Sequence, residues 1–442
     1  MMKKFFFLFL AFSFINCSSA VEFYEILNDP DNVVLNEKFA KERLSKGDLP
    51  AALSAIERVL NLKPTNTPLR LLRAELLVQL GNNSLAETEL KALLKLPLGE
   101  LQKSQVNNLM AIIEDRNSLT KNSISTSLIL ANTNNVNSYP SSGLLESFLN
   151  GNRTFSTYSS FDGESVATDD TSSQFIITYT NEYDLKNQDK DLLISRASVN
   201  VGRGDNSRYS NNRGFSIQSG LNLKRGDLLI LPSVSYTKSK GDTKADNTLI
   251  RGSLNSIMPL AESLSGNLGI SYSSLRHKND PRFTTADQGD GDSIDLSFGV
   301  DKSIRPNLIG SSKLSLTKFQ PYKSQFASGS AAYLSSQANE RGTKSLNLSL
   351  TNLLTNDSRL QMGYTYTSSK NKFADITANK IRKDSNKILS VSYFKAGKEV
   401  SSALNDWNFI GTVNRTDNNS NISQFDFNKT DFSLVATRAF DF

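Results

Sequence analysis

The chain has 442 residues, of which 38% are hydrophobic and 21% charged, and its formal net charge at pH 7 is +6. Beyond the N-terminus it contains no run of about 18 apolar residues, which excludes ordinary transmembrane helices. A single Cys and a single His are too few for a disulfide framework, a cysteine zinc site or a Ser-His-Asp triad. We therefore predict no catalytic residues, no cofactor and no metal site. The small positive charge gives no reason to expect a nucleic-acid partner.

The N-terminus has the pattern of a secretory signal peptide over residues 1–20. Two lysines precede a mostly apolar run from Phe5 to Ile15, and small residues follow up to Ala20. A basic start, an apolar stretch and a small-residue site predict cleavage after Ala20 and export from the cytoplasm. The alternative is a lipoprotein signal with a lipidated Cys17, although Asn16 replaces the small residue expected before that Cys.

Residues 21–118 have the periodicity of a helical repeat domain. Gly47 and Gly81 mark two turns 34 residues apart, and Ala40 with Ala74 and Ala52 with Ala86 share that offset. This period, with small residues where helices cross, resembles the tetratricopeptide repeat. Arg43 and Arg73 depart from the pattern, which usually has apolar or aromatic residues there. The residues expected to fill the space between the helices are Ile56, Val59, Leu60, Leu90, Leu93 and Leu94, with Leu101 to Arg116 as a closing helix.

The first helix of each repeat should line a concave groove, because such solenoids present extended surfaces. We expect this groove to bind a peptide or protein partner. For any single residue, an ordinary solvated position is the alternative interpretation. The residues at the usual groove positions are Glu37, Lys41, Ser45, Leu71, Glu75 and Gln79.

From residue 119 to 442 the periodicity changes to that of strands. Ile294, Leu296 and Phe298 face one way, while Asp295 and Ser297 face the other. This alternation recurs along the whole segment, which is typical of an outer-membrane barrel. The fold class is therefore α+β multi-domain, with an N-terminal tetratricopeptide repeat domain and a C-terminal transmembrane antiparallel barrel of about 14 strands. The predicted strands are 122–131, 172–184, 191–203, 213–223, 227–237, 247–258, 264–277, 292–302, 307–318, 343–353, 357–368, 386–396, 405–415 and 429–442.

Short and long connections alternate between these strands, as periplasmic turns and extracellular loops do. The first strand then rises from the periplasm, which places the repeats on that side. The last strand ends in Phe440 and Phe442, and it resembles the C-terminal signal read by the barrel assembly machinery. A soluble β-sandwich is the alternative, because alternation alone is compatible with it. The charged residues predicted to face the lumen are Arg196, Arg251, Asp295 and Asp301.

Two connections raise further hypotheses. The link from about 132 to 170 could be a plug or gate, or a surface loop with one short helix. The acidic segment 287–295 could offer oxygens to Ca²⁺, but its spacing does not match an EF-hand, which favours a solvated loop. His277 has no partner histidines and is expected to be exposed.

A signal peptide, a short tetratricopeptide domain and a barrel of about fourteen strands together resemble the surface lipoprotein assembly modifier family. Residues 133–137 resemble that family's Asp-Ser-Asn-x-Asn motif, with Asn135 and Asn137 matching and Thr133 and Asn134 departing from it. The resemblance implies an outer-membrane translocator of a Gram-negative bacterium, whose periplasmic repeats bind exported protein or lipoprotein cargo and whose barrel contacts outer-membrane lipids. A polysaccharide exporter and a simple porin are the alternatives.

Overall fold

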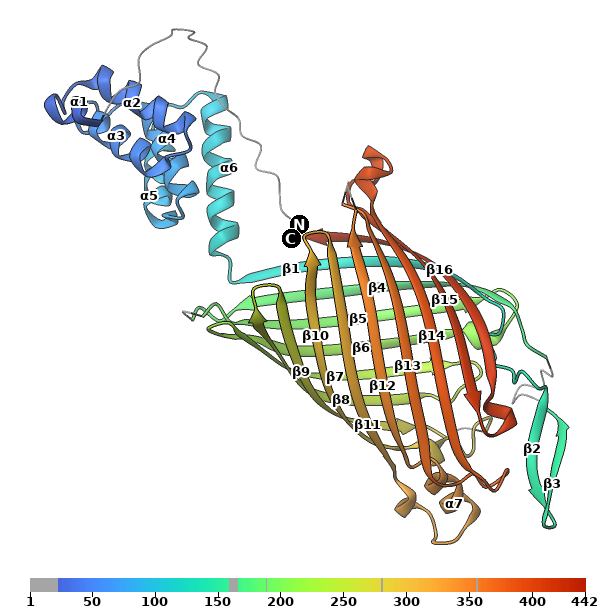
Figure 1. Ribbon diagram of the computed structural model, residues 1–442. Helices are drawn as coiled ribbons and strands as arrows, with labels where there is room; N and C mark the ends of the chain where they lie inside the picture. Colours follow the sequence, from blue (N-terminus) through green and yellow to red (C-terminus); the bar gives the residue numbers. More distant parts are fainter. Residues whose placement is uncertain (1–22, 159–165, 188, 280, 355–356) are drawn as a thin grey trace. The chain divides into compact units, whose positions relative to one another are not determined.

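The computed structural model describes residues 23–158, 166–187, 189–279, 281–354 and 357–442 (Figure 1). The predicted signal peptide lies outside these residues. The chain divides into two compact units, one ending at Ser118 and the other beginning at Leu119. In the described part of the chain, no helix is both long and apolar enough to cross a membrane.

The first unit is a stack of helices, as the 34-residue period predicts. Gly47 and Gly81 have φ of 74° and 81°, a left-handed conformation that glycine adopts without strain. Asn32, Asp48 and Asn66 cap the helices that follow them, each accepting a hydrogen bond from a first-turn backbone N–H. The helices are α1 (Phe23–Asn28), α2 (Val33–Ser45), α3 (Leu49–Leu62), α4 (Thr67–Gln79), α5 (Asn83–Leu93) and α6 (Glu100–Asn117).

The small residues lie at the crossings between helices, as expected. Ala52, Ala74 and Ala86 have no exposed surface, and Ile56, Val59, Leu90 and Leu93 are also buried. Leu94 was expected in the core and is instead 42% exposed, because it is the C-cap residue beyond the last turn of α5. The sequence did not indicate α1, which buries Ile26 against the α2–α3 pair. Helix α6 is the predicted closing helix.

The second unit is a closed antiparallel barrel of 14 strands, which confirms the predicted fold class. Each strand pairs with its neighbour along the chain, and β1 closes the ring on β16 through eleven register pairs from Ser123–Asp441 to Thr133–Asp431. The wall strands are β1 (Thr120–Thr133), β4 (Asp170–Asp184), β5 (Leu192–Gly204), β6 (Asn212–Arg225), β7 (Leu228–Gly241), β8 (Asn247–Ala261), β9 (Leu264–His277), β10 (Gly291–Arg305), β11 (Leu308–Pro321), β12 (Arg341–Leu353), β13 (Arg359–Ala374), β14 (Ile381–Ala396), β15 (Trp407–Ser420) and β16 (Phe427–Asp441).

Each predicted strand overlaps an observed one, and the largest differences lie at the loop ends. Strand β13 ends at Ala374 where 368 was expected, β14 begins at Ile381 where 386 was expected, and β15 ends at Ser420 where 415 was expected. In these extensions most outward side chains are polar, such as Lys370, Lys383 and Asp417, so the alternation that indicates a strand stops. The backbone ladder continues regardless, because hydrogen-bond pairing does not require apolar side chains.

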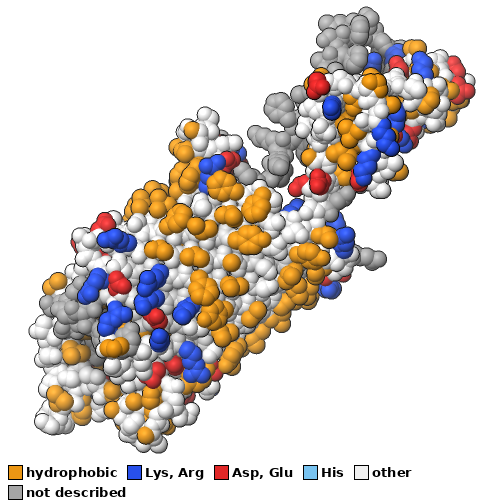
Figure 2. Space-filling view, turned by 180° about the vertical axis from the view of Figure 1, so that it is seen from behind, with side chains coloured by type: hydrophobic (Ala, Val, Ile, Leu, Met, Phe, Trp, Pro, Cys, Tyr) orange, Lys and Arg blue, Asp and Glu red, His pale blue; other side chains and the backbone are white. Residues whose placement is uncertain are grey.

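Alternate residues of each strand present an apolar outer wall. Leu389, Val391 and Tyr393 of β14 are 59%, 47% and 42% exposed, and the other strands repeat this pattern. Figure 2 shows hydrophobic side chains spread over the outside of the barrel on the face that it presents. An exposed apolar band on a closed barrel is what a lipid bilayer requires, because every backbone group is already paired.

The opposite face of the strands carries short polar side chains. Hydroxyl groups pair across neighbouring strands there, at distances of 2.6 Å for Thr178–Ser198 and 2.6 Å for Ser345–Thr367. The pair Ser127–Thr437, at 2.9 Å, lies across the β1–β16 closure. These pairs satisfy the hydroxyls within the wall, and short side chains leave space inside a barrel of this strand number.

The loops at one end of the barrel contain structure of their own. Between β1 and β4 lies a two-stranded hairpin, β2 (Leu144–Leu149) and β3 (Asn152–Thr157). Between β11 and β12 lies the helix α7 (Ala331–Ala338). At the other end the connections are short, except for segment 397–406 between β14 and β15. We call these two ends the loop end and the turn end.

Candidate functional site

The repeat unit holds the residues predicted to line a groove, on helices α2 and α4. Glu75 accepts a hydrogen bond from Gln79 Nε2 at 3.4 Å, and burial raises the pKa of its carboxyl. Ser45 donates to the carbonyl of Glu42 at 2.7 Å. Leu71 is only 9% exposed and packs in the core, so its side chain offers little surface to a partner. Glu37 is half-buried and Lys41 is exposed.

A network of charges that was not predicted joins α3, α4 and α5. Glu89 is bridged by Arg70 Nε at 2.5 Å and Arg73 Nη1 at 3.1 Å, and Arg73 Nε also reaches Glu57 at 3.1 Å. These four residues line a pocket of about 570 Å³ together with Leu60, Asn61 and Pro64. The departure of Arg73 from the repeat pattern was the one signal of this network in the sequence, because a charge at a packing position needs a partner.

The four charged residues predicted for the lumen all lie on the strand face opposite the exposed apolar residues. Two of them meet, because Arg251 Nη2 on β8 lies 3.3 Å from Asp295 Oδ2 on β10. Asp295 also accepts hydrogen bonds from Ser271 of β9, at 3.1 Å, and from Thr317 of β11. Asp301 accepts from Asn267 at 3.4 Å. Arg196, on β5, is exposed on this face.

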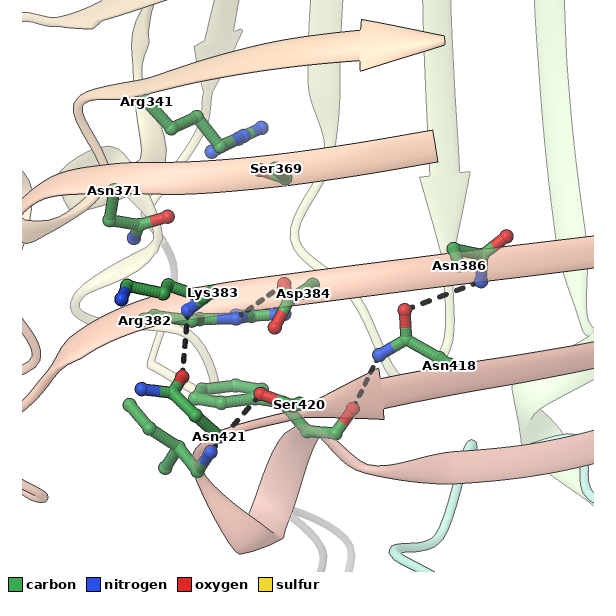
Figure 3. Close-up of polar contacts among 12 residues, drawn as sticks. Arg341, Ser369, Asn371, Arg382, Lys383, Asp384, Asn386, Asn418, Ser420 and Asn421 are labelled. Carbon is green, nitrogen blue, oxygen red and sulfur yellow. Dashed lines mark hydrogen bonds and ion pairs between the residues drawn. The ribbon is translucent and has the colours of Figure 1, made fainter. Parts of the chain in front are cut away.

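A second charged cluster occupies the inner face at the loop end of β12 to β15, and Figure 3 shows it in close-up. Arg382 Nε lies 2.7 Å from Asp384 Oδ2, and its guanidinium stacks 3.5 Å from the ring of Phe425. Asp384 Oδ1 is buried and has no hydrogen-bond partner among the described residues. Asn386 Nδ2 donates to Asn418 Oδ1 at 3.3 Å. This cluster offers both charges to a solute at the loop end.

Buried carboxylates connect the loops to one another. Asp170, at 1% exposure, accepts from the backbone N–H of Asn206 and Ser207 and from the Ser210 hydroxyl. Glu340 lies 3.0 Å from Lys372 Nζ and 3.4 Å from Lys323 Nζ. Burial alone would raise the pKa of Glu340, but hydrogen bonds from both lysines hold it below its ordinary value.

The long link between β1 and β4 contains the β2–β3 hairpin, and its described residues do not form the short helix of the surface-loop alternative. Glu146 of β2 is only 2% exposed and forms an ion pair with Lys380 of the β13–β14 loop. The backbone N–H of Phe148 donates to the carbonyl of Thr377 at 2.7 Å, and that of Glu146 to Gln424 Oε1 at 3.1 Å. The hairpin is therefore fastened to loops that come more than 200 residues later in the chain.

The two asparagines that match the family motif both act on this link. Asn135 is 5% exposed, and its Nδ2 donates to the carbonyls of Tyr139 and Asn428, at 3.1 and 3.0 Å. Asn137 Nδ2 donates to the carbonyl of Val166 at 2.9 Å. Asn135 thus connects the start of the link to β16, and Asn137 connects the start of the link to its end.

The expectation of an exposed His277 is wrong. Its Nδ1 lies 2.9 Å from Asp290 Oδ1, and Asp290 is 4% exposed. The expectation that segment 287–295 is a solvated loop is also wrong at Asp290, because that residue is buried. Asp292 bonds Tyr322, and Asp295 points to the lumen contacts described above, so these carboxylates do not converge. Among the described residues no group of three or more His, Cys, Asp or Glu side chains could hold a metal ion.

The predicted assembly signal ends the last wall strand. Phe440, on the outer face of β16, is 43% exposed, and Phe442, directly after the strand, is 69% exposed. The N–H of Phe442 donates to the carbonyl of Asn122 at 3.0 Å, at the turn end of the β1–β16 closure.

Comparison with known proteins assigns a family description to part of the first unit. A family model described as tetratricopeptide repeat matches residues 43–112. None of the curated proteins matches the chain. Among solved structures, OpdQ of Pseudomonas aeruginosa is 9% identical over 73% of this chain and 99% of its own, with a TM-score of 0.35. The outer membrane protein OprD of the same organism is 11% identical over 73% of this chain and 94% of its own, with a TM-score of 0.35. The tetratricopeptide domain of P58(IPK) is 28% identical over 21% of this chain and 26% of its own, with a TM-score of 0.19.

Proposed function

We propose that this protein is an outer-membrane translocator that helps exported proteins, lipoproteins among them, to reach the cell surface. Its repeats bind the cargo in the periplasm, and its barrel is inserted in the membrane by the barrel assembly machinery. The observation that carries the proposal is the union of two units in one chain, a tetratricopeptide domain that fits peptide recognition and a closed barrel with an apolar outer wall.

The connectivity supports the placement of the repeats in the periplasm. Strand β1 begins at Thr120, directly after α6, and runs from the turn end to the loop end. In outer-membrane barrels the turns face the periplasm and the longer loops face outside. The chain therefore enters the barrel on the side where newly exported proteins arrive.

A simple pore is the second candidate, and the polar inner wall favours it. Hydroxyl pairs such as Ser233–Ser253, at 2.8 Å, leave a wall of short side chains, and the Arg251–Asp295 pair would act on small solutes. A pore has no use for the repeat unit, whereas a translocator needs a receptor. The two functions therefore differ in what the repeats contribute.

Deletion of residues 33–118 behind the native N-terminus separates these functions. The barrel should still reach the membrane in a heat-modifiable form, because its backbone is paired without the repeats. We expect surface display of the cargo, measured by antibody binding on whole cells, to fall to background. Charge reversal at the exposed Lys41, Lys41→Glu, should lower it more mildly, since an exposed charge contributes little. Wild-type display by the deletion variant would refute the receptor role and favour a pore or a glycan exporter.

A further inference from the structure

The outward side chains of β11 to β14 change from apolar residues to lysines toward the loop end. On β11 the outward residues Leu314 and Leu316 are followed by Lys318. On β13 the outward series runs from Met362 through Tyr366 to Lys370. Strands β12 and β14 repeat the change. Five outward lysines result, and we call them the lysine patch: Lys318, Lys344, Lys370, Lys383 and Lys387, all exposed.

The strand register brings these lysines together. Lys370 and Lys383 are direct cross-strand partners in the β13–β14 ladder. Lys344 lies opposite Ser368, two residues from Lys370, and Lys318 lies opposite Gly342, two residues from Lys344. Direct partners have Cα atoms about 4.5–5.5 Å apart and diagonal neighbours remain within reach of long side chains. The patch therefore crosses four strands as one surface.

Within the described residues the patch has one acid as a direct cross-strand partner, Asp417 opposite Lys387. In the described part of the protein, none of its five ammonium groups lies within ion-pair distance of a carboxylate. The nearest acid by register, Asp417 opposite Lys387, is held by Arg415 at 3.5 Å. Like charges directly opposite one another on a sheet are destabilising. An external anion bound to both Lys370 and Lys383 would therefore reduce the repulsion between their charges.

The position of the patch along the barrel identifies the anion. Lys344 is the direct partner of Leu316, and Lys387 is the direct partner of Tyr366. The lysines thus begin where the apolar band ends, at the depth of lipid headgroups. Strand β14 separates Lys383 from Lys387 by four residues, about 13 Å, which is enough for more than one phosphate group.

The turn end of the same wall is different. Its outward positions carry aromatic residues such as Trp407 and Phe409, whose rings stack at 6.5 Å. The basic residues there are spaced apart or paired, as Arg438 is with Asp406 at 3.2 Å. On the opposite side of the barrel, Figure 2 shows Lys and Arg side chains toward the loop end, with Asp and Glu side chains among them. The two rims therefore face different surroundings.

We propose that the lysine patch binds the phosphate groups of a polyanionic lipid in the outer leaflet of the membrane. This inference rests on the membrane placement in the proposed function, with the loops outside, and not on cargo binding. Each ammonium acts as a point charge toward a phosphate oxygen, while the lipid chains contact the leucines and tyrosines directly below the patch. The site fits a headgroup with two or more phosphates and gains little from a zwitterionic one.

The test uses the full-length protein in a zwitterionic detergent and three probes: lipid A with two phosphates, phosphatidylcholine, and inorganic phosphate. Native mass spectrometry measures the bound fraction of each lipid, and competition by inorganic phosphate tests a free-phosphate site. The variant Lys370→Gln/Lys383→Gln should weaken lipid A binding by roughly tenfold or more, given about fivefold per basic residue near an anionic surface. Binding should also weaken as salt is raised.

The matched control removes the same charge elsewhere. Lys313→Gln/Lys395→Gln changes an inward lysine of β11 and an outward lysine at the turn end of β14, and it should leave lipid A binding within twofold. Equal loss in both double variants would overturn the proposal, as would equal binding of phosphatidylcholine or full competition by millimolar inorganic phosphate. Heat-modifiability checks that each variant folds. Cargo display should be unchanged in the patch variant, so failure of the lipid site and failure of the translocator function give different results.

Discussion

The substitution Leu90→Ala tests whether the two units are stabilised separately. Leu90 has no exposed surface and lies in the core formed by α4, α5 and α6. Loss of its side chain leaves a cavity that costs about 2.7–5 kcal/mol. The whole unit has a free energy of unfolding of roughly 5–15 kcal/mol. For a domain of this length the change corresponds to a decrease in Tm of about 10–40 °C, at 4–8 °C per kcal/mol.

The assay follows the helical circular dichroism of the full-length protein in detergent, while gel mobility before and after boiling reports on the barrel. We expect the helical transition to move to lower temperature and the barrel's heat-modifiability to stay unchanged. Leu85→Ala on the same helix is the matched control, because Leu85 is 57% exposed and its loss should change stability by less than about 0.5 kcal/mol. A barrel that melts together with the repeats, or a control that loses as much as Leu90→Ala, would refute the reasoning.

Burial raises the pKa of Glu75, so the repeat unit should gain stability as the pH falls through the range just above that carboxyl's ordinary pKa, and Glu75→Gln should abolish this gain in thermal melts at several pH values. Asn135→Ala leaves two buried carbonyls without their donor, at a cost of about 1–3 kcal/mol, and protease digestion of whole cells should then cut the β1–β4 link faster than in wild type. Deletion of Phe442 should leave unfolded chain in the periplasm, and normal membrane levels would show that the terminal aromatic is not a sorting signal. A cysteine at Asn206, in the loop after β5, should react with an impermeant maleimide on intact cells, whereas one at Asn61 in the repeats should react only after lysis; the reverse pattern would contradict the topology.

The strands could be predicted from the sequence because the lipid imposes the signal. Val199 and Val201 of β5 face outward while Ser198 and Asn200 face inward, so apolar and polar residues alternate in the sequence with a period of two. The strand ends could not be predicted in the same way. Arg382, Lys383 and Asp384 have no apolar alternation, yet all three belong to β14. The headgroup region accepts polar side chains on both faces, and there the composition of a strand resembles that of a loop.

The β2–β3 hairpin shows a different limit. Its apolar residues, from Leu144 to Leu149, have no clear period, and a short apolar run cannot be assigned to helix or strand by pattern alone. The contacts that fix it come from Lys380 and Gln424, which are more than 200 residues away. A local reading of the sequence contains no trace of these partners. The inner cluster of Arg382 and Asp384 could not be predicted either. It forms only because the inward faces of several strands meet at the same end of the barrel.

The motif asparagines gain a physical explanation from these contacts. Asn135 and Asn137 each satisfy backbone groups of the β1–β4 link, so a residue with both an amide donor and an acceptor is needed at either position. Asn134 also contributes, accepting from the N–H of Thr430 at 2.8 Å. The motif therefore acts in this chain as a fastening of the loop to β16.

The buried carboxylates extend that fastening around the loop end. Glu146 joins the β1–β4 link to the β13–β14 loop, Asp170 binds the loop after β5, and Glu340 binds Lys323 and Lys372 on either side of α7. Truncation of a carboxylate that is buried and paired costs more than loss of an exposed ion pair, because its partners keep their charge without compensation. These contacts connect the loops in groups. On the proposed function, a polypeptide that leaves the barrel at the loop end would have to displace such a group.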